Sequence, residues 1–340
     1  MRSKAQLGAS PATDVPARRT TEWLNLAAVL LAVALSTQAA RSSAPSAPRS
    51  AAPAGEALPP LVQSLPLAAN GEALSDATGV LVPRGPYRRI VSGSLLADPI
   101  LLELCAPEAI LAFSARARQA HDAQRYSGKP SVDVHRIEDL LALRPDLVLI
   151  NSLGEQAFTQ KLRDAGLVVF DLGRMRGVQT FLGSVLAIGW LTGHLDSARE
   201  FAGHFQLRLE AIARHLPLAA RRSALYVGVH GSKLYGGTRG TSYHDVLSYA
   251  GLVDVAARDF QGWPSYDPEQ LLLLDPEIIV TQTGGRAALC ERSELARLQA
   301  CTGRGQVIEL DSQLLDDAGL GMLEASELVH LVAYPAERAP

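Results

Sequence analysis

Apolar and polar positions from residue 88 to residue 334 follow two alternating patterns. Short apolar runs lack the every-second-residue alternation of a half-exposed strand, so they predict strands buried on both faces. Stretches with helical spacing separate these runs, an order typical of parallel sheets covered by helices. The expected strands are residues 88–93, 109–114, the second half of 137–150, 167–172, 223–230, the second half of 268–281 and 306–310. The expected helices are 98–106, the first half of 137–150, 155–166, 177–193, 196–216, 242–252, the first half of 268–281, 293–300 and 321–333.

One unit of this pattern occurs twice. The segments "IEDLLALRPDLVLI" (137–150) and "PEQLLLLDPEIIV" (268–280) align at an offset of 131 residues, which places Glu138 on Glu269. A single long offset indicates two related lobes, since a solenoid repeats at short periods. Between the copies lies the helix expected at 196–216, whose 21 residues would span about 30 Å. The sequence therefore predicts an α/β fold of two similar lobes with mostly parallel sheets, joined by one long rigid helix.

The N-terminal residues predict export from the cytoplasm. Basic residues precede an apolar run at 23–35 and small residues follow it, which is the order of a secretory signal peptide. The run is shorter than the roughly 20 residues of a membrane-spanning helix, although an uncleaved membrane anchor is the alternative. The Ala-, Pro- and Ser-rich segment that follows predicts a disordered tether. The expected organisation is a signal peptide at 1–40, the tether at 41–73, an N-terminal lobe at 74–177, a helical linker at 178–217, a C-terminal lobe at 218–334 and a tail at 335–340.

Charge gives information on binding partners, and the cysteines give information on disulfide bonding. The 340-residue chain has a net charge of −3, which gives no indication of a general affinity for nucleic acid. Export implies an oxidising compartment, so Cys290 and Cys301, which are close in sequence, are expected to form a disulfide. Cys105 lies in the apolar stretch "LLELCAPEAIL" and is expected to be a buried free thiol. Three unpaired, small apolar side chains are the alternative, and cysteines scattered in this way do not predict a metal site.

Four segments, in this order, resemble those of one family. They are "LSDATGVLVPRGPYRRIVSG" (74–93), which resembles an opening β-hairpin, the helix–Pro–strand unit at 137–150, "YGGTRGTSYHDVLSYAGLVDVA" (235–256) and "YDPEQLLLLDPEIIV" (266–280). Together they make the chain similar to the class III, or helical-backbone, substrate-binding proteins of ABC importers, which carry cobalamin, ferric siderophores or haem. The resemblance covers residues 74–334. It implies a periplasmic monomer without a cofactor of its own, which binds a metal chelate in the cleft between its lobes and delivers it to a permease dimer with ATPase subunits.

The two repeated glutamates acquire a role from this resemblance. The helix dipole favours a carboxylate in the first turn by about 0.3–1 kcal/mol, and this alone would account for Glu138 and Glu269. In the family, one glutamate at the tip of each lobe contacts arginines of a permease subunit, and such charge-assisted contacts are strong and directional. The resemblance therefore implies that Glu138 and Glu269 dock on the permease. His135 is expected near the same docking surface.

Candidate ligand-binding residues lie in the loops after the predicted strands, because open α/β sheets bind ligands at the carboxyl ends of their strands. They are Ser92, Ser94, Arg116, Arg118, His121, Tyr126, Ser152, Arg174, Met175, His230, Tyr235, Arg239, Tyr243, Trp263, Tyr266 and Thr283. Asn151, Arg176, His244 and Arg286 lie in the same loops. Trp263 stands between Gly and Pro, where it is hard to bury in a core, so it predicts a wall of the cleft. The arginines suit contacts with anionic groups.

These residue types suit a large chelate without naming it. A ferric siderophore is expected first, a corrinoid second and haem third. Haem would need an axial Tyr or His, and the candidates are Tyr126, His121, Tyr235 and His230, but no spacing singles one out. An aromatic residue precedes the docking glutamate in some cobalamin and haem members of the family. It is missing from "KPSVDVHRIED" (129–139), which disfavours both of those ligands.

Three other functions compete with this one. A protein for free zinc or manganese ions would need about four converging ligands, and His121, His230, His244 and one carboxylate could supply them, although the aromatic residues would then have no role. A stand-alone sensor or scavenger with the same fold would need no permease. An enzyme is not expected, because the chain lacks a nucleophile elbow, a P-loop and a dinucleotide-binding fingerprint. The glycine-rich "GGTRGTS" (236–242) has no lysine to bind a phosphate.

Overall fold

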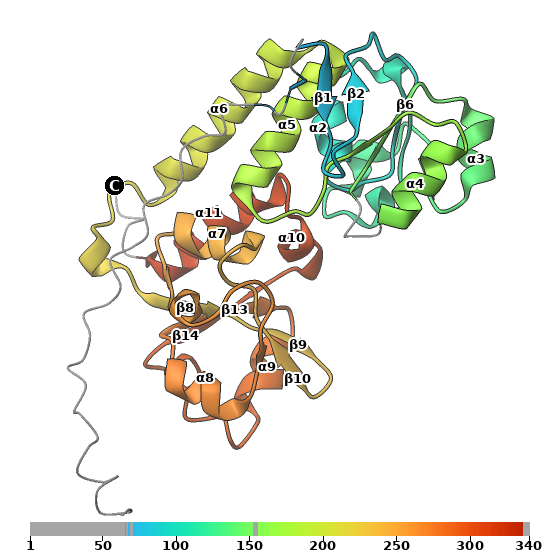
Figure 1. Cartoon of the computed structure of the whole chain (residues 1–340). Helices are drawn as coiled ribbons and strands as arrows, with labels where there is room; N and C mark the ends of the chain where they lie inside the picture. Colours follow the sequence, from blue (N-terminus) through green and yellow to red (C-terminus); the bar gives the residue numbers. More distant parts are fainter. Residues whose placement is uncertain (1–64, 66, 69–70, 152–155, 336–340) are drawn as a thin grey trace, which may run out of the picture. The chain divides into compact units, whose positions relative to one another are not determined.

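The computed structural model describes residues 65, 67–68, 71–151 and 156–335, which are drawn in colour in Figure 1. The predicted signal peptide, nearly all of the predicted tether, Ser152 and the end of the chain lie outside the described residues. All described residues belong to one compact unit, Pro53–Pro340. Among them, no helix is both long enough and apolar enough to cross a membrane.

Five parallel strands form the sheet of the N-terminal lobe, in the order β5-β4-β3-β6-β7. They are β3 (Ile90–Ser92), β4 (Ile110–Ser114), β5 (Ser131–Val132), β6 (Leu147–Ile150) and β7 (Val169–Asp171). Every residue of β3, β6 and β7 is buried, as the continuous apolar runs predicted. The α-helices of this lobe are α2 (Ala97–Leu104), α3 (Ile137–Leu143) and α4 (Gln156–Asp164), and its short 3-10 helices are η1 (Pro107–Ala109), η2 (Ala115–Gln119) and η3 (Ala123–Tyr126).

Four parallel strands form the main sheet of the C-terminal lobe, in the order β11-β8-β13-β14. They are β8 (Ser223–Tyr226), β11 (Val253–Asp254), β13 (Ile278–Gln282) and β14 (Gln306–Leu310). A small antiparallel sheet of β9 (Gly228–His230), β10 (Lys233–Tyr235) and β12 (Ser265–Tyr266) stands beside it. The helices are α7 (Ser242–Tyr249), α8 (Pro268–Leu274), α9 (Gly285–Cys290), α10 (Ser312–Asp316) and α11 (Gly321–Ala333).

The two lobes repeat one another in detail. The strand order β4-β3-β6-β7 matches β11-β8-β13-β14, with all strands parallel. Helices α3 and α8 both end at a non-glycine residue in the left-handed conformation, Arg144 (φ 48°) and Asp275 (φ 33°), and these residues are related by the same offset of 131. Side chains at another matched pair of positions, Asp146 and Glu277, accept hydrogen bonds from backbone N–H groups beside the first strand of each lobe. The predicted two-lobed α/β fold is therefore confirmed.

Two helices connect the lobes and lie against each other, α5 (Val178–Thr192) and α6 (Leu195–Ile212) (Figure 1). Their contact is close, since a Cβ on Gly189 would lie 2.3 Å from Cβ of Ala198. Helix α6 has 18 residues and is about 27 Å long, slightly shorter than expected. The largest cluster of buried apolar side chains joins residues of α2, α5, α6, α7 and α11. The connecting helices therefore share a core with both lobes.

The predicted opening hairpin is present and is fastened by one buried carboxylate. Strands β1 (Ala73–Ser75) and β2 (Leu81–Pro83) are antiparallel. In the turn between them, Asp76 accepts hydrogen bonds from the N–H and hydroxyl of Thr78 and from the N–H of Val80. The same carboxylate forms an ion pair with Arg163 of α4 and accepts the N–H of Asp171 in β7. A local turn motif thus ties the hairpin to the edge of the N-terminal sheet.

The prediction of a helix at 293–300 is wrong. These residues form turns that end in a short 3-10 helix, Gln299–Cys301. The Cα atoms of Cys290 and Cys301 are only 5.4 Å apart, whereas an eight-residue helix between them would be about 12 Å long. The strand expected at 223–230 also divides, because Val227 separates β8 from β9, which turns away to pair with β10.

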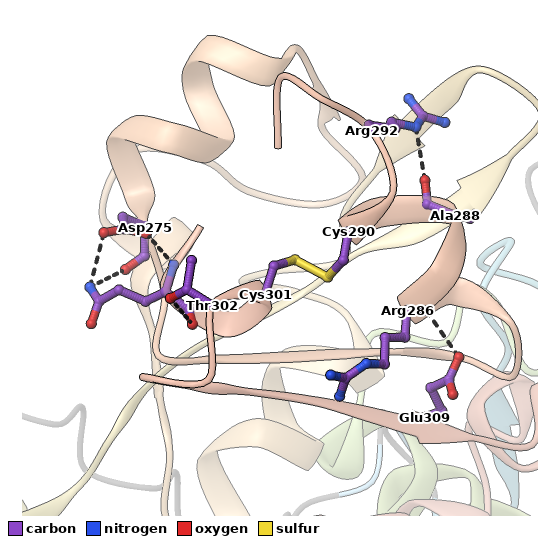
Figure 2. The surroundings of a disulfide bond; sticks show 9 residues. Asp275, Arg286, Ala288, Cys290, Arg292, Cys301, Thr302 and Glu309 are labelled. Atoms are coloured by element: carbon purple, nitrogen blue, oxygen red, sulfur yellow. Dashed lines mark hydrogen bonds between the residues drawn. A yellow bond between two sulfur atoms is a disulfide. The ribbon is translucent and has the colours of Figure 1, made fainter. Parts of the chain in front are cut away.

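Cys290 and Cys301 form a disulfide, as predicted, between the end of α9 and the 3-10 helix (Figure 2). Cys105 is free and buried. Closing a loop of this length is expected to stabilise the folded state by about 2–3 kcal/mol. The double variant Cys290→Ser/Cys301→Ser should lower the free energy of unfolding in urea by that amount. Reductant should destabilise the wild type equally and leave the double variant unchanged, and an equal response of both proteins would contradict the assignment.

Candidate ligand-binding site

Two adjoining hollows lie at the carboxyl ends of the strands, with walls from both lobes. Their volumes are about 490 Å³ and about 510 Å³. They share a wall made of Leu95, Arg116, Met175, Asp316, Asp317 and Ala318. The N-terminal lobe contributes the loops after β3, β4 and β7 to this wall, and the C-terminal lobe contributes the segment from α10 to α11. The cleft expected between the lobes is therefore present.

The first hollow is lined mainly by the N-terminal lobe. Its own residues are Gly93, Leu96, Val134, His135, Ile150, Asn151, Phe158 and Gly319. The imidazole of His135 lies against the ring of Phe158, with centroids 4.4 Å apart and planes tilted by 36°. Gly93 allows Val134 to approach the backbone closely, because a Cβ at this position would lie 2.1 Å from Cγ1 of Val134. Outside the shared wall, the first hollow is therefore mostly apolar, with the imidazole of His135 and the amide of Asn151 as its polar side chains.

The second hollow has an aromatic wall from the C-terminal lobe. Tyr243 stacks on Tyr226 with ring centroids 3.7 Å apart, and Trp263 meets Tyr243 edge-on at 5.2 Å. Trp263 nevertheless keeps 59% of its surface exposed, so its ring presents a large apolar face to the cleft. The remaining residues of this hollow are Gln119, Ala120, Arg174, Ser242, Gln313 and Leu315.

The phenol of Tyr243 is held neutral. Its hydroxyl donates a hydrogen bond to Oδ1 of Asp316 at 3.0 Å. Burial, followed by the neighbouring Tyr226 and Asp316, raises the pKa of Tyr243 far above its usual range. Tyr243 therefore acts as a hydrogen-bond donor and an aromatic surface, and it is poorly suited to bind a metal as a phenolate.

Charges of both signs line the cleft. Arg116 and Arg174 are exposed and come from the N-terminal lobe, whereas Asp316 and Asp317 come from the C-terminal lobe. Asp317 accepts hydrogen bonds from the N–H groups of Gly319 and Gly321 at the start of α11, and burial raises its pKa. Asp316, Arg116 and Arg174 are exposed and line the second hollow, so they can contact polar groups of a ligand.

A further contact joins the C-terminal lobe to the connecting helices. Oδ2 of Asp245 in α7 accepts the N–H of Val178, the first residue of α5, at 2.6 Å. Burial raises the pKa of Asp245 to about 6. The contact needs glycine at position 177, where φ is 121° and a Cβ would lie 2.1 Å from the same carboxylate oxygen.

Five of the predicted ligand-binding residues line the hollows: Arg116, Arg174, Met175, Tyr243 and Trp263. Ten others lie elsewhere, namely Ser92, Ser94, Arg118, His121, Tyr126, His230, Tyr235, Arg239, Tyr266 and Thr283. Two of these are buried serines that bond each other, since the hydroxyl of Ser92 donates to the carbonyl of Ser94. Two are buried tyrosines, Tyr126 against Phe113 and Tyr266 against Phe260.

Three of the six remaining predicted residues contact side chains or backbone groups outside the hollows. Arg118 donates to Oγ of Ser131 at 3.0 Å, and Thr283 donates to the carbonyl of Leu310 at 3.2 Å. The ring of His121 lies 3.4 Å from the carboxylate of Glu324. His230 and Tyr235 belong to the β9–β10 hairpin, and Arg239 follows it. Their roles in ligand binding stay predictions.

The three histidines considered for a free metal ion are not brought together. Nδ1 of His244 pairs with Asp254 at 2.8 Å, whereas His121 lies beside Glu324 and His230 is in the hairpin. Among the described residues, no group of three or more His, Cys, Asp or Glu side chains is placed to hold a metal ion.

Sequence reasoning missed the part of the wall that runs from Gln313 to Gly319. The signal was available, because "LDDAGLG" (315–321) follows the predicted strand 306–310, and the rule about strand ends was not applied to it. His135, which was expected near the docking surface, lines the first hollow, and its place beside a docking surface stays a prediction.

Glu138 and Glu269 occupy the first turns of α3 and α8, and both are exposed. Helix α8 starts with a capping box, in which Oδ1 of Asp267 accepts the N–H of Gln270 and the Gln270 side chain accepts the N–H of Asp267. In α3, the neighbouring Asp139 is paired with Arg136. Neither glutamate is used to cap its helix, so both carboxylates are presented to solvent.

Two lobes of one topology, a connecting pair of helices and a hollow between the lobes define a binding protein of the class III, helical-backbone type. The chain belongs to the periplasmic binding protein family, whose pattern matches residues 90–314.

Solved structures and curated relatives agree with this assignment. The fold is similar to the periplasmic vitamin B12-binding protein BtuF of Vibrio cholerae (TM-score 0.60, 22% identity, 75% of this chain and 99% of that chain). It is also similar to the periplasmic heme-binding protein HutB of the same species (TM-score 0.63, 19% identity, 72% and 98%). In sequence, the chain is 24% identical over 206 residues to a cobalamin-binding protein of Halobacterium salinarum, covering 58% of this chain and 55% of the relative. It is 23% identical over 205 residues to the uncharacterized ABC transporter substrate-binding lipoprotein YvrC of Bacillus subtilis, covering 58% and 65%. The chain thus spans somewhat more than half the length of these curated relatives.

Proposed function

We propose that this protein is the extracytoplasmic binding component of an ABC importer and that it captures a metal chelate in the two hollows. The observation that carries the proposal is the shared wall, where Arg116 and Met175 border both hollows. A ligand that fills both is much larger than a metal ion or an amino acid, since small-molecule sites typically measure about 300–1,000 Å³. Family membership supports a binding role and gives no support for catalysis.

The lining favours a chelate with anionic groups at its edge. Arg116 and Arg174 can form charge-assisted hydrogen bonds with carboxylate, phosphate or other anionic oxygens. Trp263 and Tyr243 on one side, and Phe158 with His135 on the other, offer apolar surfaces to the body of the ligand. Relatives and structural neighbours named for cobalamin and heme support the same class.

Within this class we rank a ferric siderophore first, a corrinoid second and haem third. The four axial candidates for haem, Tyr126, His121, Tyr235 and His230, do not line the hollows. Tyr243 lines the second hollow, but its raised pKa opposes coordination as a phenolate. Among the described residues, His135 is the one histidine that lines the hollows, so haem, which would need an axial His or Tyr, is ranked third.

Delivery is proposed to use the two lobe tips. Glu138 and Glu269 stand at matched positions of the repeat, in the first turns of exposed helices. A permease dimer would present two equivalent basic pockets, and two matched carboxylates fit such a partner. We propose that the protein acts as a monomer in the periplasm after removal of its signal peptide.

The proposal is tested by titrating ligand-free protein with a ferric hydroxamate siderophore, cyanocobalamin and haemin, followed by tryptophan fluorescence and native mass spectrometry. One of the three should bind with a defined stoichiometry of one ligand per chain. The variant Arg116→Gln should weaken that binding by about 10- to 100-fold, because it removes a charge-assisted hydrogen bond. The matched variant Arg199→Gln, on the exposed face of α6, should bind like the wild type. Failure of all three chelates to bind, together with saturable binding of free zinc or manganese, would contradict the proposal.

A further inference from the structure

Helix α8 carries a leucine that the fold does not use. Leu271 is fully buried in the C-terminal core, and Leu272 and Leu274 pack partly against it. Leu273, between them, is 86% exposed, which is the greatest exposure of any large apolar side chain among the described residues. Leu273 follows Glu269 by four residues, so both side chains lie on the same face of the helix.

The internal repeat provides a control for this position. The residue of α3 that corresponds to Leu273 is Ala142, and α3 has the same length and the same left-handed end as α8. An alanine at this position is therefore sufficient for the helix to form and end in the same way. The additional apolar surface of Leu273 has no structural explanation within the lobe.

A single exposed leucine is common on protein surfaces and means little by itself. The N-terminal lobe, however, also has an exposed leucine close to its glutamate, at a different position of the repeat. Leu141 of α3 is 43% exposed and follows Glu138 by three residues, whereas its counterpart Leu272 is partly buried. Each lobe thus places an exposed leucine one helical turn from its glutamate, but at different positions of the repeat. Similarity between the two copies of the repeat therefore does not account for the pairing of an exposed leucine with a glutamate in both lobes.

We propose that each lobe tip is a mixed docking surface, in which the leucine enters an apolar recess beside the cationic residues that meet the glutamate. The partner is the membrane subunit of the importer, so this inference rests on the proposed function. Leu273 is more exposed than Leu141 and has more apolar area to bury, so the C-terminal lobe makes the stronger apolar contact. The two lobes therefore bind the two membrane subunits of the importer with unequal strength.

The two components of such a surface respond differently to salt. Salt screens exposed charges over a Debye length of about 10 Å at 0.1 M and about 3 Å at 1 M. Burial of apolar area is not weakened by salt. A docking surface made only of carboxylates would release its partner at high salt, whereas a mixed surface retains part of its affinity.

The test measures binding of the full-length chain to the permease–ATPase complex from the same organism, reconstituted in lipid nanodiscs, at low and high sodium chloride. Leu273→Ala should bind about tenfold more weakly than the wild type at both salt concentrations. Leu141→Ala should show a smaller loss. Glu269→Gln should show a loss that shrinks at high salt, and the matched control Leu207→Ala, an exposed leucine on α6, should show none.

The outcomes separate the inference from the proposed function. If the wild type binds and Glu269→Gln weakens binding but Leu273→Ala does not, the mixed surface is refuted and the docking role of the glutamates stands. If the wild type does not bind the complex, both fail. Native mass spectrometry of the wild type and Leu273→Ala, each without the importer, tests whether a second copy of this chain binds Leu273 instead. A wild-type dimer that is lost in Leu273→Ala would also overturn the inference. Leu273→Gln repeats the test with a side chain of similar length, and equal melting temperatures of all variants show that each is folded.

Discussion

Replacing Glu138 or Glu269 with lysine is expected to stop delivery of the ligand to the importer while leaving capture of the ligand intact. Both carboxylates are exposed in the first turn of their helices and lie outside the two hollows. Reversing a charge that meets arginine replaces an attraction by a repulsion, which we expect to cost about 2–5 kcal/mol, or about 30-fold or more in affinity. Uptake into proteoliposomes containing the importer measures delivery, and chelate titration measures capture.

The matched control is Glu200→Lys, an exposed reversal on helix α6 that changes the net charge by the same amount. It should leave uptake near the wild-type level, because its effect is limited to long-range electrostatics. The double variant Glu138→Lys/Glu269→Lys should be more defective than either single variant. Normal uptake by the single variants, with chelate binding intact, would remove both glutamates from the docking surface.

Asp76→Ala is expected to be the most destabilising substitution considered for this protein. The Asp76 side chain is completely buried, and it satisfies donors from its own turn, from Arg163 of α4 and from the backbone of β7. Its removal leaves the Arg163 side chain, which is only 14% exposed, without its carboxylate partner. Breaking one side of such a buried pair typically costs about 3–5 kcal/mol. Urea unfolding followed by circular dichroism should show a loss of this size.

Asp164→Ala serves as the control, because Asp164 neighbours Arg163 on α4 but is exposed. A change within about 0.5 kcal/mol is expected there. The double variant Asp76→Ala/Arg163→Met should recover part of the stability, since it removes the unpaired buried charge. A loss below about 1 kcal/mol for Asp76→Ala alone would mean that water replaces the carboxylate and that the turn does not fasten the hairpin.

The order of the elements was predictable because burial imposes a local signature on parallel strands. The continuous apolar runs of β3, β6 and β13 could be recognised without knowledge of their neighbours. The helix expected at 293–300 failed for the opposite reason. Its residues favour a helix locally, but the Cys290–Cys301 bond holds the ends of the segment at a separation that a helix cannot adopt. Short strands such as β10 and β12 were missed because they are defined by their pairing, which lies outside any local window.

The candidate site was predicted only in part, since the loop after a strand indicates where a side chain starts and not where it points. Arg116 lies in the cleft, whereas Arg118, two residues further along the same 3-10 helix, bonds Ser131. Tyr126 was expected at the ligand because it is a polar aromatic residue in the right loop, but it packs on Phe113. Only tertiary packing decides between such neighbours. The wall at Asp316 was accessible to the same rule that found Arg116, and it was missed because the rule was not extended to the last strand.

Helix α3 and strand β6 link the proposed docking position to the first hollow. Strand β6 begins four residues after the end of α3, the helix that carries Glu138, and it ends at Ile150, which lines the first hollow together with Asn151. His135, three residues before Glu138, lines the same hollow, so residues that border a ligand lie on both sides of this helix–strand unit. A partner docked on α3 would therefore contact a segment that lines the hollow at both of its ends. Strand β13 leads from α8 to Thr283, which does not line either hollow. In the C-terminal lobe the lining residue of the corresponding segment, Trp263, comes before α8 instead, so a partner docked on either lobe would act close to the bound ligand.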